Sequence, residues 1–189
     1  MKILYVVGHP YQGSFNHAIM TTFVKAAKVH SNVEVVDLSA SDFDPVLRFG
    51  YAKRMEDEFL ILRSKQYLQW ADRIVFAFPE WWGMMPSVLS GWIARVFTPG
   101  LAYNINGFKV SKLLAGKTAN VIITSSAPRI IWPFVGNGGF KVLKKNLFYV
   151  TGIKDVKDFY LDLLNTNMDS PKRRKKFLDK IEKYALELK

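Results

Sequence analysis

An aromatic, sulfur-rich loop follows a short apolar run in the middle of the chain. The run Ile74–Phe78 leads into a segment that holds two adjacent tryptophans and two adjacent methionines: Trp81, Trp82, Met84 and Met85. Such side chains are rarely left uncovered beyond a strand, and together they suit a flat, apolar ligand. Our hypothesis is that this ligand is a flavin. A lone tryptophan would more often belong to the core or to a dimer interface.

A second loop, Gly8–Asn16, carries residues suited to holding an anion. It ends where a helix is expected to start, so backbone N–H groups and the helix dipole favour negative charge there. Ser14 and Asn16 offer short hydrogen-bonding side chains, and Gly13 permits close backbone approach. His9 can donate to a phosphate. Together they predict phosphate binding, whereas Ser14 or Asn16 alone would more often be a helix cap.

A third loop begins with Thr124, Ser125 and Ser126, which are small enough to lie against the edge of a ring. An ordinary connection is an equally good interpretation of this loop. The sequence lacks the motifs of a hydrolase and of a metalloenzyme. No serine lies in a nucleophile elbow, and the three histidines have no nearby carboxylate that would indicate a metal site. A hydrolase or a metalloenzyme is therefore disfavoured.

The composition is that of an ordinary globular protein, with 49% hydrophobic and 23% charged residues. A length of 189 residues predicts one domain over 1–189. The absence of cysteine agrees with a cytoplasmic location. No apolar run approaches the roughly 20 residues of a membrane span.

The net charge of +11 is concentrated in the run Lys172–Lys176. Apolar residues at helical spacing follow this run, so it is expected on the solvated face of a terminal amphipathic helix. Binding of nucleic acid through this helix is the alternative, although no base-reading motif accompanies it.

Five apolar runs alternate with helical patterns. Strands are expected at Ile3–Val7, Val33–Leu38, Ile74–Phe78, Ala119–Thr124 and Val156–Leu161. Helices are expected at Asn16–Val29, Arg54–Gln69, Pro86–Phe97 and Phe140–Leu147, with a terminal helix that Asp169–Pro171 begins. This order predicts an α/β fold of three layers, a flavodoxin-like doubly wound parallel sheet of five strands in the order 2-1-3-4-5. Its ligand crevice would lie at the loops after strands one, three and four, which are the loops above.

Specific segments match one family in the same order along nearly the whole chain: Gly8-His9-Pro10, Ser14-Phe15-Asn16, Phe78-Pro79, Pro86–Trp92, Arg95–Tyr103, Thr124-Ser125 and Ala127-Pro128. In these the chain resembles the NAD(P)H:quinone oxidoreductase family, the flavodoxin-like-2 group that includes bacterial NADPH-quinone reductases. The resemblance implies a homodimer with a flavin, FMN or FAD, at the subunit interface. It also implies a ping-pong mechanism in which NAD(P)H gives a hydride to flavin N5 and leaves before a quinone-like acceptor takes it.

The resemblance also assigns site residues. His9, Ser14, Phe15 and Asn16 would hold the flavin phosphate. The ring would contact Pro79, Glu80, Trp81, Trp82, Thr124, Ser125 and Ser126. Tyr103 of the partner subunit would line the acceptor pocket.

The chain departs from the mammalian members at two places. Those members carry a tyrosine and a histidine after the fourth strand, proposed to relay charge from the reduced flavin, and Pro128–Trp132 has neither. Arg129 is the obvious cation there that could steady a reduced flavin or hold the NADPH phosphate. Glu80 replaces an apolar or neutral residue, so it either changes the electronics of the ring or faces solvent.

Two further interpretations concern partners. Relatives exist that regulate potassium-efflux systems, so an ancillary regulatory flavoprotein is an alternative function. The helix Pro86–Phe97 carries two apolar stripes, which predicts cover by the sheet and by a partner subunit, unless the helix is deeply buried within one chain.

Overall fold

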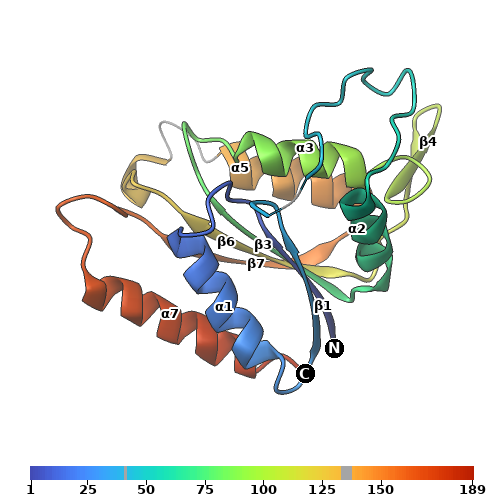
Figure 1. Cartoon of the computed structure of the whole chain (residues 1–189). Coiled ribbons are helices and arrows are strands. Elements are labelled where there is room, and N and C mark those ends of the chain that lie inside the picture. The colour runs from blue at the N-terminus through green and yellow to red at the C-terminus, as the bar shows by residue number, and fades with distance from the viewer. Residues whose placement is uncertain (41, 133–137) are drawn as a thin grey trace.

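The structure is a computed structural model that describes residues 1–40, 42–132 and 138–189. A parallel sheet lies at its centre (Figure 1). The strands of this sheet are β1 (Lys2–Val7), β2 (Asn32–Asp37), β3 (Arg73–Pro79), β6 (Thr118–Thr124) and β7 (Lys154–Leu161). They lie in the order β2-β1-β3-β6-β7, and every neighbouring pair is parallel. The expected flavodoxin-like order is confirmed.

The apolar runs form strands because both faces of the sheet are covered. Ile3–Val7 in β1 and Ile74–Phe78 in β3 are fully buried, as central strands of a parallel sheet require. The edge strand β2 buries only Val36, which agrees with its alternation of apolar and acidic residues.

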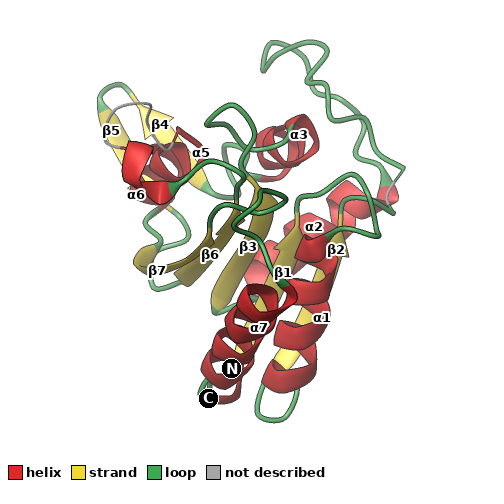
Figure 2. Cartoon of the chain, turned by 90° about the vertical axis from the view of Figure 1, so that its left-hand side faces the viewer, coloured by secondary structure: helices red, strands yellow, loops and turns green. Residues whose placement is uncertain are grey.

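Helices cover the two faces of the sheet and complete the three layers (Figure 2). One face carries α1 (Phe15–Ala27) and α7 (Pro171–Leu186). The other carries α2 (Phe59–Trp70), α3 (Ser87–Val96) and a continuous helix made of α5 (Gly138–Lys141), the π-helical η2 (Val142–Phe148) and α6 (Tyr149–Thr151). In the described part of the chain, no helix combines the length and the apolar character needed to cross a bilayer.

Helix boundaries differ from the prediction at three places. The helix predicted from Arg54 begins only at Phe59, because the preceding residues belong to a loop held by side-chain contacts. Pro86 is the N-cap of α3 and not its first residue. The helix predicted at Phe140–Leu147 continues to Thr151, and Gly152 ends it with a left-handed φ of 88°.

A two-stranded hairpin between α3 and β6 is absent from the sequence prediction. Its strands, β4 (Tyr103–Asn106) and β5 (Lys109–Lys112), pair antiparallel around Gly107, whose φ is 59°. The hairpin extends away from the sheet (Figure 1). Its Ile105 and Phe108 side chains are exposed.

The two apolar stripes of α3 are mostly, but not fully, covered within a single chain. Leu89, Trp92 and Val96 are fully buried, and Val88 and Ile93 pack against the same core. Val88 and Ile93 are only partly buried, and their further cover by a partner subunit stays a prediction.

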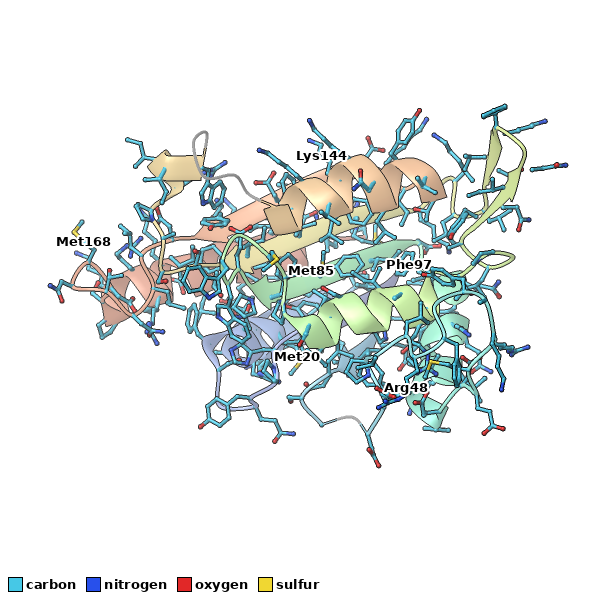
Figure 3. All side chains as sticks on the ribbon, turned by 90° about the horizontal axis from the view of Figure 1, so that it is seen from above. Met20, Arg48, Met85, Phe97, Lys144 and Met168 are labelled. Atoms are coloured by element: carbon cyan, nitrogen blue, oxygen red, sulfur yellow. The ribbon has the colours of Figure 1, made fainter. Side chains whose placement is uncertain are left out.

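The long loop between β2 and α2 is fastened to α3 by one buried arginine. The Arg95 guanidinium donates to the carbonyl oxygens of Asp44 at 2.9 Å and Glu56 at 2.6 Å, and to a carboxylate oxygen of Glu58 at 2.6 Å. An arginine of the loop itself, Arg48, forms an exposed ion pair with Asp44 (Figure 3).

Candidate functional site

The loops after β1, β3 and β6 meet at one edge of the sheet because these parallel strands are neighbours. Two adjoining cavities lie there, of about 530 and 340 Å³. They share the lining residues Glu80, Trp81, Ser125 and Ser126. The predicted meeting of the three loops is confirmed.

The smaller cavity is lined mainly by groups that can form hydrogen bonds. Besides the shared residues it brings together His9, Tyr11, Gly13, Ser14, Phe15, Asn16, Pro79, Thr124, Leu164, Asn165 and Arg174. All the residues assigned to the phosphate by resemblance therefore lie in one cavity.

The start of α1 opens into this smaller cavity without a side-chain cap. Ser14 occupies the N-cap position, but its hydroxyl accepts no N–H of the helix. Asn16 is buried, donates from Nδ2 to Thr124 Oγ1 at 2.9 Å, and keeps a buried Oδ1 with no partner among the residues that the structure describes. The first turn can therefore offer N–H groups to an anion.

The larger cavity has an aromatic wall. It is lined by Trp81, Trp82, Gly83, Ala127 and Trp132 in addition to Glu80 and the two serines. The Trp82 side chain is 95% exposed. Met84 is exposed as well, whereas Met85 packs against the core beside α3 (Figure 3).

A tight turn presents Trp82 on this wall. Trp81 and Met84 exchange two backbone hydrogen bonds of 2.9 and 2.8 Å. The residues between them, Trp82 and Gly83, both have positive φ, 55° and 73°, which is the pattern of a type I′ turn. A bulky aromatic residue is strained in this conformation, and such strain is concentrated at ligand sites.

Glu80 lies where the two cavities meet. Its side chain is buried, Oε2 accepts a hydrogen bond from the Tyr160 hydroxyl at 3.3 Å, and Oε1 has no partner in the described protein. Burial raises the pKa of the carboxyl, although the hydrogen bond from Tyr160 and the proximity of the Gly139 backbone N–H oppose the rise. The alternative in which Glu80 faces solvent is wrong.

Replacing Glu80 with Gln is expected to remove a pH-dependent loss of stability. Folding raises the pKa of this carboxyl, so the native state disfavours its ionised form. The native state therefore loses stability as pH rises above the pKa of the unfolded chain and through that of the folded chain. Urea unfolding at pH 4, 6 and 8 should show the Glu80→Gln protein becoming progressively more stable than wild type. A stability difference that does not change with pH would contradict a buried, titrating Glu80.

Two aromatic residues beside Glu80 were missed in the sequence. Tyr160 comes from β7, and its ring meets that of Trp132 edge-on with centroids 3.8 Å apart. Burial raises the pKa of the Tyr160 hydroxyl, so it is a neutral donor at physiological pH. The alternation of β7 could have placed Tyr160 on the face opposite Phe159, but β7 is a weak strand pattern.

Arg174 is the third functional candidate missed by sequence reasoning. Its guanidinium lies 5.2 Å from the centre of the Phe15 ring and is held by Asp169 and by Asn165 Oδ1 at 2.8 Å. The prediction placed the whole run Lys172–Lys176 on a solvated face. For Arg174 this is wrong, because the first turn of α7 starts beside the smaller cavity.

The flavodoxin-like fold family matches residues 1–185 of the chain. A ribosyldihydronicotinamide dehydrogenase [quinone] of Pongo abelii is 30% identical over 163 residues, which cover 74% of this chain and 70% of the relative. The chain belongs to the NAD(P)H:quinone oxidoreductase family.

Other similar proteins agree with this membership. An NAD(P)H dehydrogenase [quinone] 1 of Cavia porcellus is 27% identical over 190 residues, covering 80% of this chain and 69% of the relative. The crystal structure of Smu.1420 from Streptococcus mutans UA159 has 34% identity and a TM-score of 0.88, with each chain fully covered. Like its relatives in the quinone oxidoreductase family, the protein is an oxidoreductase.

The two residues expected to act in the reaction of this family lie outside both cavities. Tyr103 begins β4, and its assignment to the pocket of a partner subunit stays a prediction. Arg129 is exposed on the short helix η1 (Arg129–Ile131), with its guanidinium 5.5 Å from the Trp132 ring. Its proposed action on the flavin or on NADPH also stays a prediction.

One histidine has a carboxylate partner that the sequence did not reveal. His17 Nε2 lies 3.1 Å from both carboxylate oxygens of Asp37. The two residues meet because α1 starts and β2 ends at the same edge of the sheet. Among the described residues there is still no group of three or more potential metal ligands.

Proposed function

We propose that the protein is a flavin-dependent NAD(P)H:quinone oxidoreductase. The observation that carries this proposal is that two cavities adjoin: one is lined by hydrogen-bond donors that can bind an anion, and the other has a wall of tryptophans. A flavin has the same division, because a phosphate and a flat, apolar ring are joined by a flexible chain.

The smaller cavity would hold the phosphate. His9, Ser14 and Asn16 lie at the open start of α1, where the helix dipole favours an anion. Phe15 would pack on the connecting chain, and Arg174 adds a positive charge. The same groups suit FMN or the diphosphate of FAD, so the proposal covers both cofactors.

The larger cavity would hold the ring. Trp81 and Trp82 would pack on it, and Ser125 and Ser126 would lie along its edge. Pro79 and Thr124 would contact the ring from the side of the smaller cavity, which they line. Glu80 would contact it from the junction of the cavities. When bound there, a flavin supplies two-electron hydride chemistry, and backbone N–H groups of these loops would stabilise developing negative charge.

The expected ping-pong order is part of the proposal, and the shape of the site is compatible with it. The ring cavity is bounded by protein on the side of Glu80 and Trp81, and we expect NAD(P)H and the quinone-like acceptor to use the remaining open side in turn. Release of the oxidised nicotinamide would then precede entry of the acceptor.

A homodimer in the cytoplasm is part of the proposal. Two exposed apolar surfaces support the dimer. The one on the hairpin consists of Ile105, Phe108 and Val110, and the one on the loop that precedes α2 consists of Val46, Phe49 and Tyr51. Exposed apolar area of this kind usually marks an interface. A partner seated there could bring its own Tyr103 to the ring cavity.

Reconstitution tests the proposed function directly. The protein, stripped of any ligand, is titrated with FMN and separately with FAD, and binding is followed by quenching of flavin fluorescence. The loaded protein should bleach on anaerobic addition of NADH or NADPH and recover its colour on addition of a quinone. Failure to bind either flavin at micromolar concentration would exclude the proposal.

Arg174→Gln should weaken FMN binding by about tenfold, because a partly exposed guanidinium contributes roughly 1.4 kcal/mol to holding a phosphate. Riboflavin, which lacks the phosphate, should bind the variant and the wild type equally. Arg173→Gln is the matched control, since Arg173 instead pairs with Asp162 at 3.0 Å and does not line the cavity. Equal loss of FMN and riboflavin affinity would show that Arg174 has no role specific to the phosphate.

A further inference from the structure

A chain of hydrogen bonds leads from β2 to the phosphate cavity. Asp37 holds His17 Nε2 at 3.1 Å, and His17 Nδ1 lies 2.8 Å from the hydroxyl oxygen of Ser14. Asp37 itself is fixed, because it accepts from the backbone N–H of Ser39 at 2.9 Å and from its hydroxyl at 2.7 Å. His17 is buried and does not line the cavity, whereas Ser14 does.

The partners of His17 determine which ring nitrogen carries the proton. The nitrogen that faces a carboxylate is the one that keeps its hydrogen, so neutral His17 is protonated at Nε2. Its Nδ1 is then an acceptor, and the only hydrogen that Ser14 can supply is its hydroxyl hydrogen. With neutral His17, Ser14 therefore directs its O–H into the protein and presents only lone pairs to the cavity.

Protonation of His17 reverses this arrangement. Nδ1 then carries a hydrogen and donates to Ser14 Oγ, which releases the Ser14 hydroxyl hydrogen toward the cavity. Lone pairs repel a phosphate, and a hydroxyl donor attracts it. The same serine is thus a poor phosphate ligand in one protonation state of His17 and a good one in the other.

We propose that His17 is a positioning residue of the phosphate site, which couples binding of the flavin phosphate to uptake of one proton. This inference rests on the proposed function, because it requires a phosphate beside Ser14. By linkage, phosphate binding favours the protonated imidazole, and the affinity for FMN increases as pH falls.

Two other titratable or charged groups lie near the hydrogen-bonded chain Asp37–His17–Ser14. His9 lies edge-on to His17 with ring centres 6.3 Å apart, and burial, then the charge of His17, lowers the pKa of His9. The lowered pKa favours the neutral form of His9. Arg174 also lines the cavity, and it remains charged throughout.

Calorimetric titration with FMN and with riboflavin tests the coupling. Measurements run from pH 6.5 to 8.5, above the second ionisation of a phosphate monoester near pH 6, and in buffers of different ionisation enthalpy, which count the protons taken up. Wild type should bind FMN more tightly at lower pH, with a change of at most about tenfold per pH unit and with uptake of up to one proton. Riboflavin affinity should not change with pH.

The variants separate a relay from a packing role. His17→Gln should make FMN affinity independent of pH and abolish the proton uptake, while leaving riboflavin affinity unchanged. Ser14→Ala should likewise make FMN affinity independent of pH and abolish the proton uptake. The loss of this small hydroxyl scarcely disturbs packing. This variant covers the case in which His17→Gln does not fold.

Three results would overturn the proposal. In the first, the proton uptake persists in Ser14→Ala or His17→Gln. In the second, riboflavin shows the same pH dependence as FMN in wild type. In the third, wild type binds FMN without proton uptake across this range. Absence of FMN binding at every pH would instead remove the proposed function, so the two failures are distinguishable.

Discussion

Trp82→Asn is expected to stabilise the free protein by about 1 kcal/mol and to weaken flavin binding by ten- to a hundredfold. The gain in stability follows from the backbone. Trp82 has a φ of 55°, a conformation that costs an L-residue with a large side chain roughly 1–2 kcal/mol. Asparagine followed by Gly83 is the preferred sequence for a type I′ turn.

The loss of flavin follows from the side chain. Trp82 is 95% exposed in the free chain, and an indole in that position gains contact only when a ligand covers it. Removing an aromatic wall of this size should cost about 1–3 kcal/mol of binding. Urea unfolding of the free protein and fluorescence titration with FMN measure the two effects separately.

Asp155→Gly provides a matched control for Trp82→Asn. Asp155 has a similar φ of 50° and is exposed at the start of β7, at the other end of that strand from the site. This change should relieve strain without changing flavin affinity. Unchanged flavin binding by Trp82→Asn would contradict the placement of the ring, and a loss of stability would contradict the strain argument.

Arg95→Leu is expected to lower the free energy of unfolding by about 3 kcal/mol. The Arg95 side chain is 2% exposed, and its removal leaves two carbonyl oxygens and Oε2 of Glu58 without their donor, while Glu58 Oε1 keeps the Asp44 backbone N–H. Breaking a buried pair by removing one partner typically costs 3–5 kcal/mol. The lower figure applies because Glu58 remains 32% exposed and can recover water.

The exposed arginine of the same loop is the control for Arg95→Leu. Arg48 pairs with Asp44 at the surface, and its side chain is 62% exposed. Arg48→Ala should change stability by less than about 0.5 kcal/mol. Similar losses in the two variants would mean that the loop is not fastened through Arg95.

The sheet was predictable because the sequence pattern of each central strand is visible without knowledge of its neighbours. Ile3–Val7 and Ile74–Phe78 are continuously apolar, and only a doubly covered parallel sheet accommodates several such runs separated by helices. The hairpin was missed because its strands are only four residues each and mostly polar. The dipeptide Asn106-Gly107 between Ile105 and Phe108 was the available signal.

The loops of the site were predictable, but several of its side chains were not. His9–Asn16 and Pro79–Trp82 stood out through unusual composition in the right place. Arg174 was indistinguishable from its basic neighbours, because a run of charges does not reveal which residue meets a loop 160 residues earlier. The pairing of His17 with Asp37 likewise depends on sheet order.

The site of the empty protein contains several unsatisfied polar groups. The first turn of α1 has no side-chain cap, and the buried oxygens Asn16 Oδ1 and Glu80 Oε1 have no partner within the described ranges 1–40, 42–132 and 138–189. A ligand that satisfies any of them binds only the native chain, and at a concentration of 100 times its Kd it adds about 2.7 kcal/mol to stability. In a cell, the lifetime of this protein would then follow the supply of its cofactor, since the empty form is the one exposed to unfolding and proteolysis.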